Sequence, residues 1–321
     1  MDSNKVQIKI LVVSTPPPPP LKRWFPVLIP MILVVNVILF LVTMYVNNCP
    51  ELSIPPTSCF ATFLGRFSFQ PLEQNYLLGP SYYPLIKMGA LHVDKLVHIH
   101  QAWRLFTSMW LHHGVLDLLS NTLFLVIIGI PLEKEFGSVR IGLVYVISGL
   151  GGNLLCVLFL DSIIYVGSSG AISGLQGLIL SELLTKWRIH THKFVKLLIL
   201  ILLISTDLAL GTFPFENNFS TIGGFTSGFL LGFAILIRSQ YNGVNLTKSN
   251  SSPKQESYQY ALRVISFVLL SVGLVGGLVL FFKWVDLNDY CSWCHCITCA
   301  PPSCKLGYIS CEDYQIGNQL K

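Results

Sequence analysis

Seven apolar stretches, each close to the length of a bilayer crossing, limit what this chain can fold into. They lie at residues 24–46, 105–131, 141–160, 163–184, 194–213, 219–237 and 260–282. A transmembrane helix needs about 20 mostly apolar residues. Lipid offers the backbone no hydrogen-bond partners, so spanning segments of this length are helical. We therefore predict an all-α, polytopic helical membrane protein with seven crossings.

The composition agrees with this prediction. Hydrophobic residues make up 52% of the 321 positions and charged residues only 12%, about half of the roughly 25% typical of soluble domains. This balance excludes a soluble globular enzyme and a disordered chain. The net charge of +5 is interpreted as an orientation signal, and no nucleic-acid partner is expected.

Three segments are expected along the chain. Residues 1–23 form a cytosolic tail with the pentaproline Pro16–Pro20, which is either a stiff polyproline spacer or a ligand for a partner module. Residues 24–283 form the membrane domain, with a non-cytosolic first loop at 47–101, and 284–321 form a cysteine-rich, non-cytosolic tail. The first apolar run is too long for a signal peptide and is taken as a retained helix.

The basic residues predict the orientation. With a cytosolic N-terminus, cytosolic segments hold 14 of the 21 lysines and arginines, and the short loops on the opposite side hold none. Short cytosolic loops are enriched in lysine and arginine, so we expect a cytosolic N-terminus. The glycosylation sequons at Asn245 and Asn250 would then face the cytosol and stay unmodified.

Eight of the nine cysteines fall on the predicted non-cytosolic side. They are Cys49, Cys59, Cys291, Cys294, Cys296, Cys299, Cys304 and Cys311. An even number in an oxidising compartment favours disulfides, which could tie the tail to the first loop. The C-x2-C spacings in the tail leave a zinc site as the competing interpretation.

Polar residues inside apolar spans mark candidate functional sites, because burying them in lipid is costly. The second span contains His112, His113, Asp117 and Asn121. The other clusters are Gly167-Ser168-Ser169-Gly170 in the fourth span, Asp207 in the fifth and Thr221 with the glycines after it in the sixth. No role is assigned to Asp207 beyond a hydrogen bond within the bundle.

Glycines at four-residue spacing predict where two of the spans pack together. The repeat residues are Gly170, Gly174, Gly224, Gly228 and Gly232. Small residues at this spacing let helix backbones approach closely in lipid. Contact between the fourth and sixth spans would bring Ser169 near Thr221.

Five sequence elements, in order over residues 24–283, carry a resemblance to a known family. They are Trp103-Arg104, His112 with Asn121, Gly129-Ile130-Pro131-Leu132-Glu133 with Gly137, Gly167-x-Ser169-Gly170, and Gly223-Gly224. Together they resemble the rhomboid intramembrane serine proteases, most of all the plant members. The resemblance implies a six-helix core plus a seventh C-terminal helix in a secretory-pathway membrane, either Golgi or plasma membrane. It also implies a nucleophile position at Ser169, no cofactor and no metal, while Trp103 and Arg104 would anchor the first loop at the membrane interface.

Two positions depart from the family pattern. Thr221 stands where the family has its catalytic histidine, and Asp117 replaces a histidine that contributes to the oxyanion site beside Asn121. A threonine hydroxyl is no more basic than the serine it should activate. Shifting the alignment supplies no other base, because the sequence has no histidine between His192 and His295.

The expected function is therefore that of an inactive rhomboid-like protein, a pseudoprotease that binds transmembrane segments of client proteins in the bilayer. Ser169 would then act as a packing residue. The alternative is an intramembrane serine endopeptidase in which Ser169 uses an unconventional base, such as a rewired His113–Asp117 pair. A metal site at His112, His113 and Asp117 is disfavoured for lack of a further ligand, and a transporter for lack of a charged or repeated pathway.

Overall fold

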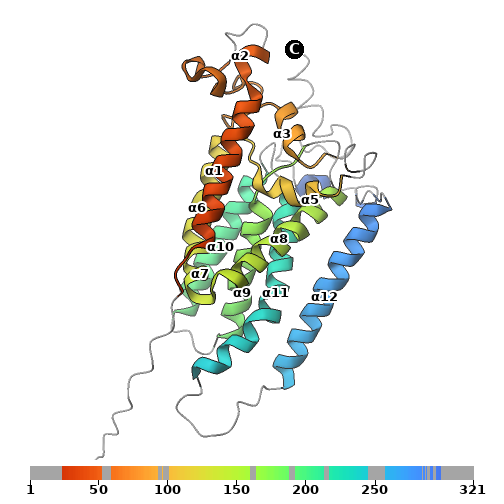
Figure 1. Ribbon diagram of the computed structural model, residues 1–321. Coiled ribbons are helices and arrows are strands. Elements are labelled where there is room, and N and C mark those ends of the chain that lie inside the picture. The colour runs from red at the N-terminus through yellow and green to blue at the C-terminus, as the bar shows by residue number, and fades with distance from the viewer. Residues whose placement is uncertain are drawn as a thin grey trace, which may run out of the picture.

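The computed structural model describes residues 24–52, 59–92, 96, 101–159, 164–187, 192–212, 217–244 and 257–283, with a few positions between 285 and 297. Pro16–Pro20 and the sequons at Asn245 and Asn250 lie outside these residues. Within them, long helices form one bundle (Figure 1). Beside the composite second helix described below, they are α1 (Leu28–Asn47), α8 (Ser138–Leu158), α9 (Ser169–Thr185), α10 (Lys193–Leu210), α11 (Asn218–Val244) and α12 (Ser257–Phe282).

The bundle has the character of an integral membrane protein. Among the residues that the structure describes, four helical segments are long and apolar enough to cross a membrane: Leu28–Glu51, Val115–Phe136, Ser138–Leu158 and Tyr260–Phe282. α9, α10 and α11 pack beside them in the same bundle. The chain is thus a polytopic helical membrane protein, as the apolar stretches predict.

The second long helix is a composite that begins later than its apolar stretch. It consists of α6 (Val115–Phe124), a π-helical turn, η4 (Leu125–Gly129), and α7 (Ile130–Phe136). The predicted start near residue 105 is wrong, because that region forms only the short turns α5 (Arg104–Thr107) and η3 (Ser108–Trp110). A non-helical segment then leads into α6.

The first loop determines where α6 begins. The backbone N–H of Val115 donates to the carbonyl of Leu78 at 3.0 Å, and that of Leu116 donates to Leu77 at 3.2 Å. These bonds satisfy donors that a helix start leaves unpaired. A side chain at Gly114 would overlap the Leu77 carbonyl, so this glycine permits the approach.

The start of α1 is held by a carboxylate from the composite helix. Glu133, which is fully buried, accepts hydrogen bonds from the backbone N–H groups of Val27, Leu28 and Ile29 at 2.7–2.9 Å. The Ser138 hydroxyl donates to the same carboxylate at 2.6 Å. A negative charge at a helix N-terminus is favourable, so Glu133 joins α1 to α7 and α8.

α9 and α11 form the centre of the bundle. A Cβ on Gly224 would overlap the carbonyl of Gly170, and one on Gly228 would overlap that of Gly174. On the same face, Gly232 lies against the Ser181 hydroxyl. The two backbones are therefore in direct contact along two helical turns, as small-residue repeats allow.

Two other helices lie at the periphery. Among the described residues of α10, only Leu200 and Asp207 are buried. In α12 only 17% of the spanning window is buried, and the helix stands at the edge of the bundle in Figure 1. Most of the remaining surface of both helices is exposed or half-buried, and the surroundings of a membrane protein are lipid.

The elements outside the bundle gather at one end of it in Figure 1. They are α2 (Cys49–Leu52), η2 (Thr62–Phe67), α3 (Tyr82–Met88) and η6 (Cys294–Ile297). Disulfides join Cys49 to Cys59 and Cys291 to Cys294. Both bonds are local, so these four cysteines do not make the expected link between tail and first loop. The side chains of the other candidates, Cys296, Cys299, Cys304 and Cys311, lie outside the described part of the chain.

Candidate functional site

Ser169 is the first residue of α9 and is 8% exposed. Gly167 precedes it with a φ of +143°, a conformation that favours glycine and that turns the chain into the helix. The Ser169 hydroxyl and the Tyr165 hydroxyl share a hydrogen bond of 2.8 Å. The serine is therefore already paired with a neighbour that the sequence analysis did not single out.

The segment before α6 runs alongside this turn. The Gly167 N–H donates to the carbonyl of Ser108 at 3.0 Å. From α8, the Asn153 amide donates to the Leu105 carbonyl at 2.8 Å and to the Ser108 hydroxyl at 2.9 Å. Asn153 was missed in the sequence, although an asparagine inside an apolar span is itself a signal of this kind.

Thr221 lies on α11, beside the start of α9, and is 4% exposed. Its backbone carbonyl accepts a hydrogen bond of 2.9 Å from the Ser173 hydroxyl, one turn after Ser169. The preceding residue, Ser220, lies against Gly170. The glycine contact thus brings the surroundings of Ser169 and Thr221 together.

Asp117 lies in the first turn of α6 and binds the residue just before the N-cap of the helix. Its carboxylate accepts the backbone N–H of His113 at 2.8 Å, an arrangement similar to the acidic half of a capping box. The Asn121 amide nitrogen donates to the carbonyl of Asp117 at 3.0 Å and also contacts its carboxylate. The amide of Asn121 is therefore directed at Asp117.

His112 and His113 are buried, but they precede α6. His113 therefore does not share a helical face with Asp117, because the helix begins only at Val115. The hydrogen bond of 2.8 Å between the two residues uses the His113 backbone N–H and not its ring. Among the residues that the structure describes, no three His, Cys, Asp or Glu side chains are grouped as metal ligands would be.

Arg104 is buried, and its side chain contacts the first loop. Its guanidinium donates to the carbonyls of Ile86 and Ala90 at 2.7 and 2.8 Å, and it lies 4.8 Å from the ring centre of Trp103. Ile86 is in the last turn of α3, where carbonyls lack helical partners. The arginine therefore attaches α3 to α5, at the start of the segment that leads into α6.

Comparison with known proteins identifies the family. A model of the Rhomboid domain matches residues 99–238, which contain every site residue named above except Ile86 and Ala90. RHOMBOID-like protein 1 of Arabidopsis thaliana is 52% identical over 311 residues, covering 94% of this chain and 79% of that protein. The chain belongs to the rhomboid family.

Two further relatives show how widely rhomboid proteins of this similarity differ in their names. RHOMBOID-like protein 6, mitochondrial, of Arabidopsis thaliana is 44% identical over 287 residues, or 88% of this chain and 94% of that protein. Inactive RHOMBOID-like protein 8 of the same plant is 37% identical over 300 residues, or 89% and 85%. Relatives with and without the word "inactive" in their names thus both match most of the chain, so the site itself must indicate whether this rhomboid cleaves.

Proposed function

We propose that this rhomboid protein is catalytically inactive and binds transmembrane segments of client membrane proteins. The observation that carries the proposal is Thr221, which occupies the place on α11 beside the start of α9 where the resemblance puts the catalytic histidine. The structure gives Ser169 a tyrosine as its hydrogen-bond partner, at 2.8 Å. A serine hydrolase needs a base that takes the hydroxyl proton near neutral pH.

The expected loss of activity is large. In a serine protease, removing the base alone lowers turnover by about 10⁶-fold. The oxyanion side is also changed, because the Asn121 amide is directed at Asp117. Loss of one oxyanion donor costs a further factor of about 10²–10³ where the effects are independent.

A second candidate function rests on the pair of hydroxyls. Tyr165 could serve Ser169 as an unconventional base in an intramembrane serine endopeptidase. Tyrosine has an ordinary pKa of about 10, and Tyr165 is buried in an apolar cluster with Leu91 and Leu105. A phenol with this ordinary pKa is a poor general base near neutral pH, so we favour the inactive form.

Client binding is supported by the small number of buried residues in α10. Only Leu200 and Asp207 of its described residues are buried, and Asp207 accepts a long hydrogen bond of 3.4 Å from Gln176 on α9. A client helix that packs beside α10 would displace little existing contact. We also propose a cytosolic N-terminus and a secretory-pathway membrane, which rest on the lysine and arginine distribution and on the resemblance.

The activity is tested with the purified full-length protein and a serine-directed fluorophosphonate. We expect no labelling of Ser169, and no cleavage of a rhomboid substrate helix. Labelling of the unchanged protein that disappears in Ser169→Ala would overturn the inactive assignment. If the single variant Tyr165→Phe also loses this labelling, the second candidate is established. The double variant Thr221→His, Asp117→His is expected to gain measurable cleavage if the positions are assigned correctly.

Client binding needs a separate test. A photoreactive amino acid is placed in turn at Leu198 and Leu202, two exposed residues one helical turn apart on α10. We expect crosslinks to single-span membrane proteins from these positions. The matched control is Val139 on α8, which is also exposed. Equal capture at the control position would remove the support for a client site at α10.

A further inference from the structure

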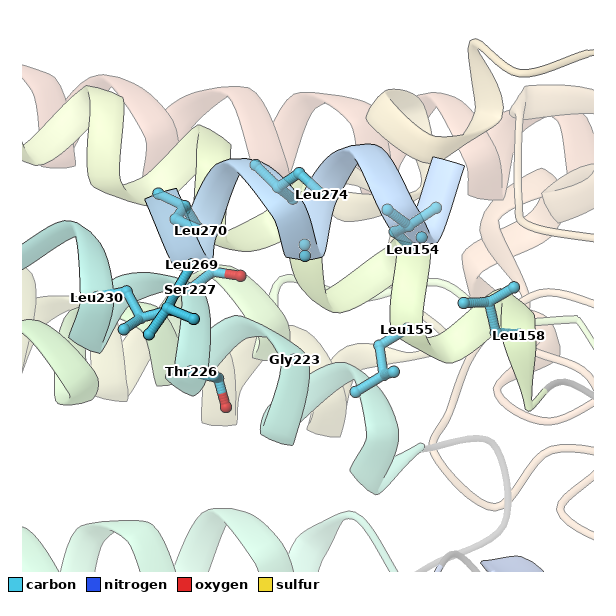
Figure 2. A pocket seen from close by; sticks show the side chains of 13 residues that line it. Leu154, Leu155, Leu158, Gly223, Thr226, Ser227, Leu230, Leu269, Leu270 and Leu274 are labelled. Atoms are coloured by element: carbon cyan, nitrogen blue, oxygen red, sulfur yellow. The ribbon is translucent and has the colours of Figure 1, made fainter. Parts of the chain in front are cut away.

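An apolar cavity lies between α8, α11 and α12, and neither Ser169, Tyr165 nor Thr221 lines it. Its walls are the last two turns of α8, the first half of α11 and the second half of α12 (Figure 2). The cavity measures about 210 Å³. Leucines from all three helices line it, among them Leu154, Leu230 and Leu274.

The lining is mostly apolar, and its polar side chains are Thr226 and Ser227. The hydroxyl of Thr226 donates to the Ile222 carbonyl of its own helix at 2.8 Å, so it does not require a polar ligand. Gly273 leaves the α12 wall open, because a Cβ there would meet nothing within 4 Å. An apolar cavity of this kind excludes water and accepts hydrocarbon, as an engineered cavity of about 150 Å³ accepts benzene.

The size of the cavity distinguishes a lipid chain from a helix. A helix with its side chains is about 10–12 Å across, so it could lie over the opening of a cavity of about 210 Å³ but not within it. A polymethylene chain is thin enough to lie along it. The cavity therefore fits one acyl chain better than it fits a client helix.

The cavity lies in the half of α12 nearest its C-terminal end and extends slightly past the thickness of one leaflet. Its α12 residues run from Leu269 to Gly277, and at 1.5 Å per residue they lie about 8–20 Å from the end of α12 at Phe282. Half of the hydrocarbon core is about 15 Å thick. Leu158, at the end of α8, also lines the cavity, and its carbonyl accepts the Leu287 N–H at 2.9 Å, so α8 and α12 end at the same level.

A positively charged residue lies at the level where α8 and α12 end. Lys283 directly follows α12 and is exposed. No ion pair of Lys283 with another described residue is present, so its ammonium group can bind a lipid phosphate at the membrane surface. We propose that the cavity between α8, α11 and α12 is a phospholipid site, in which an acyl chain fills the cavity and Lys283 binds the phosphate.

The test uses the full-length protein in nanodiscs that contain a phosphatidylcholine with a diazirine midway along one acyl chain. After illumination, we expect the label to be concentrated in the cavity-lining residues of α11 and α12, at 223–230 and 269–277. Even labelling around the bundle, including the exposed faces of α1 and α10, would overturn the proposal. So would a crosslink from this face to a second copy of the chain or to a client helix.

Two glycines of α12 provide matched variants. Gly273→Leu fills the cavity, whereas Gly276→Leu adds the same side chain at a glycine that does not line it; neither position has an atom within 4 Å of the added Cβ. We expect Gly273→Leu to lower labelling of residues 223–230 several-fold and Gly276→Leu to leave it unchanged. Equal labelling in the two variants would contradict an acyl site.

The phosphate contact is tested by Lys283→Gln, with Lys87→Gln in the first loop as the control. We expect a smaller loss of labelling than with Gly273→Leu, and faster exchange of the bound lipid. No change in either quantity would overturn the assignment of Lys283. Both variants lie outside the bundle core, so they report on the lipid and not on folding.

Discussion

The α9–α11 contact and the α10 contact differ sharply in how they hold a helix in the bundle. Between α9 and α11, glycines let the backbones touch, so a single added methyl group would collide with a carbonyl oxygen. By contrast, α10 is attached through Leu200 and through the Asp207–Gln176 hydrogen bond. The comparison teaches that the chain packs its backbones most closely beside Ser169 and Thr221. Any adaptation to a partner is then expected at the periphery.

The largest effect is expected from Gly224→Leu. The added side chain cannot be accommodated, because it meets the Gly170 backbone and not the end of a flexible side chain. Overpacking of a tight contact costs about 1–3 kcal/mol and occasionally more, and we expect the upper end or complete loss of folded protein. Thermal unfolding in detergent, followed by circular dichroism, measures this. Gly276→Leu on α12 is the control, and an equal effect of both changes would mean that the α9–α11 contact is not special.

The next effect is expected from Glu133→Ala. It removes the acceptor for three backbone N–H groups of α1 and for Ser138. Hydrogen bonds to a charged group contribute about 1.5–3 kcal/mol each, although water can reach part of the freed donors, so we expect a loss of about 2–3 kcal/mol in all. Unfolding temperatures measure the change. Glu135→Ala, two residues away and half-exposed, should cost much less.

A smaller effect is expected from Asp207→Leu, and it should be confined to α10. The change removes the hydrogen bond to Gln176 and leaves a buried amide without that partner. Interhelical hydrogen bonds in membranes are worth about 0.6 kcal/mol on average and up to about 1.7. Hydrogen exchange should become faster in α10 but not in α9, whereas Asp207→Asn should leave both unchanged. Faster exchange throughout the bundle would show that α10 is as tightly integrated as α11.

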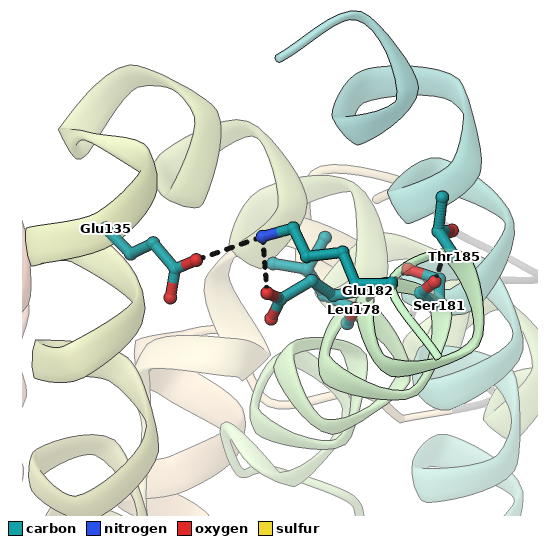
Figure 3. Close-up of polar contacts among 6 residues, drawn as sticks. Glu135, Leu178, Ser181, Glu182 and Thr185 are labelled. Atoms are coloured by element: carbon teal, nitrogen blue, oxygen red, sulfur yellow. Dashed lines mark hydrogen bonds and ion pairs between the residues drawn. The ribbon is translucent and has the colours of Figure 1, made fainter. Parts of the chain in front are cut away.

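The smallest effect is expected from Lys186→Met. The ammonium group bridges Glu182 at 2.7 Å and Glu135 at 3.2 Å, which joins the end of α9 to α7 (Figure 3). Burial lowers the Lys186 pKa, but the charges of Glu182 and Glu135 outweigh it and hold the pKa above its ordinary value. Exposed and partly exposed ion pairs contribute about 0–1 kcal/mol, and the unfolding temperature should fall by a correspondingly small amount.

The pH dependence of this pair has a definite sign. A raised pKa in the folded state means that the contribution is fully present below the ordinary lysine pKa, about 10.4, and is lost as the pH rises through the folded value. The difference in unfolding temperature between Lys186→Met and the unchanged protein should therefore be constant near neutral pH and shrink above about pH 10. A difference that grows with pH would contradict the bridge.

The sequence predicts what depends on local spacing. The lengths of the apolar stretches indicate the helices, and the four-residue spacing of Gly170, Gly174, Gly224 and Gly228 indicates which of them touch. The role of Asp117 could not be predicted in this way, because it depends on where α6 begins. That start is determined by the carbonyls of Leu77 and Leu78, which lie far away in the sequence.

Two further features could not be predicted from the sequence, for related reasons. Tyr165 and Ser169 are four residues apart, but a turn and not a helix joins them, so their contact has no periodic signature. The disulfide partners depend on the path of the chain between cysteines, and Cys49 finds Cys59 within the first loop. In both cases the geometry of an irregular segment decides the outcome.

The cap on α1 has a consequence for biosynthesis. The first turn of α1 and the carboxylate of Glu133 are separated by about a hundred positions in the chain. Translation proceeds at about 5–20 residues per second. Roughly 5–20 s therefore pass between the synthesis of the first turn of α1 and that of Glu133. During that interval its first N–H groups must be satisfied by water or by the insertion machinery. The start of α1 is thus completed only when the helix that carries Glu133 has been made.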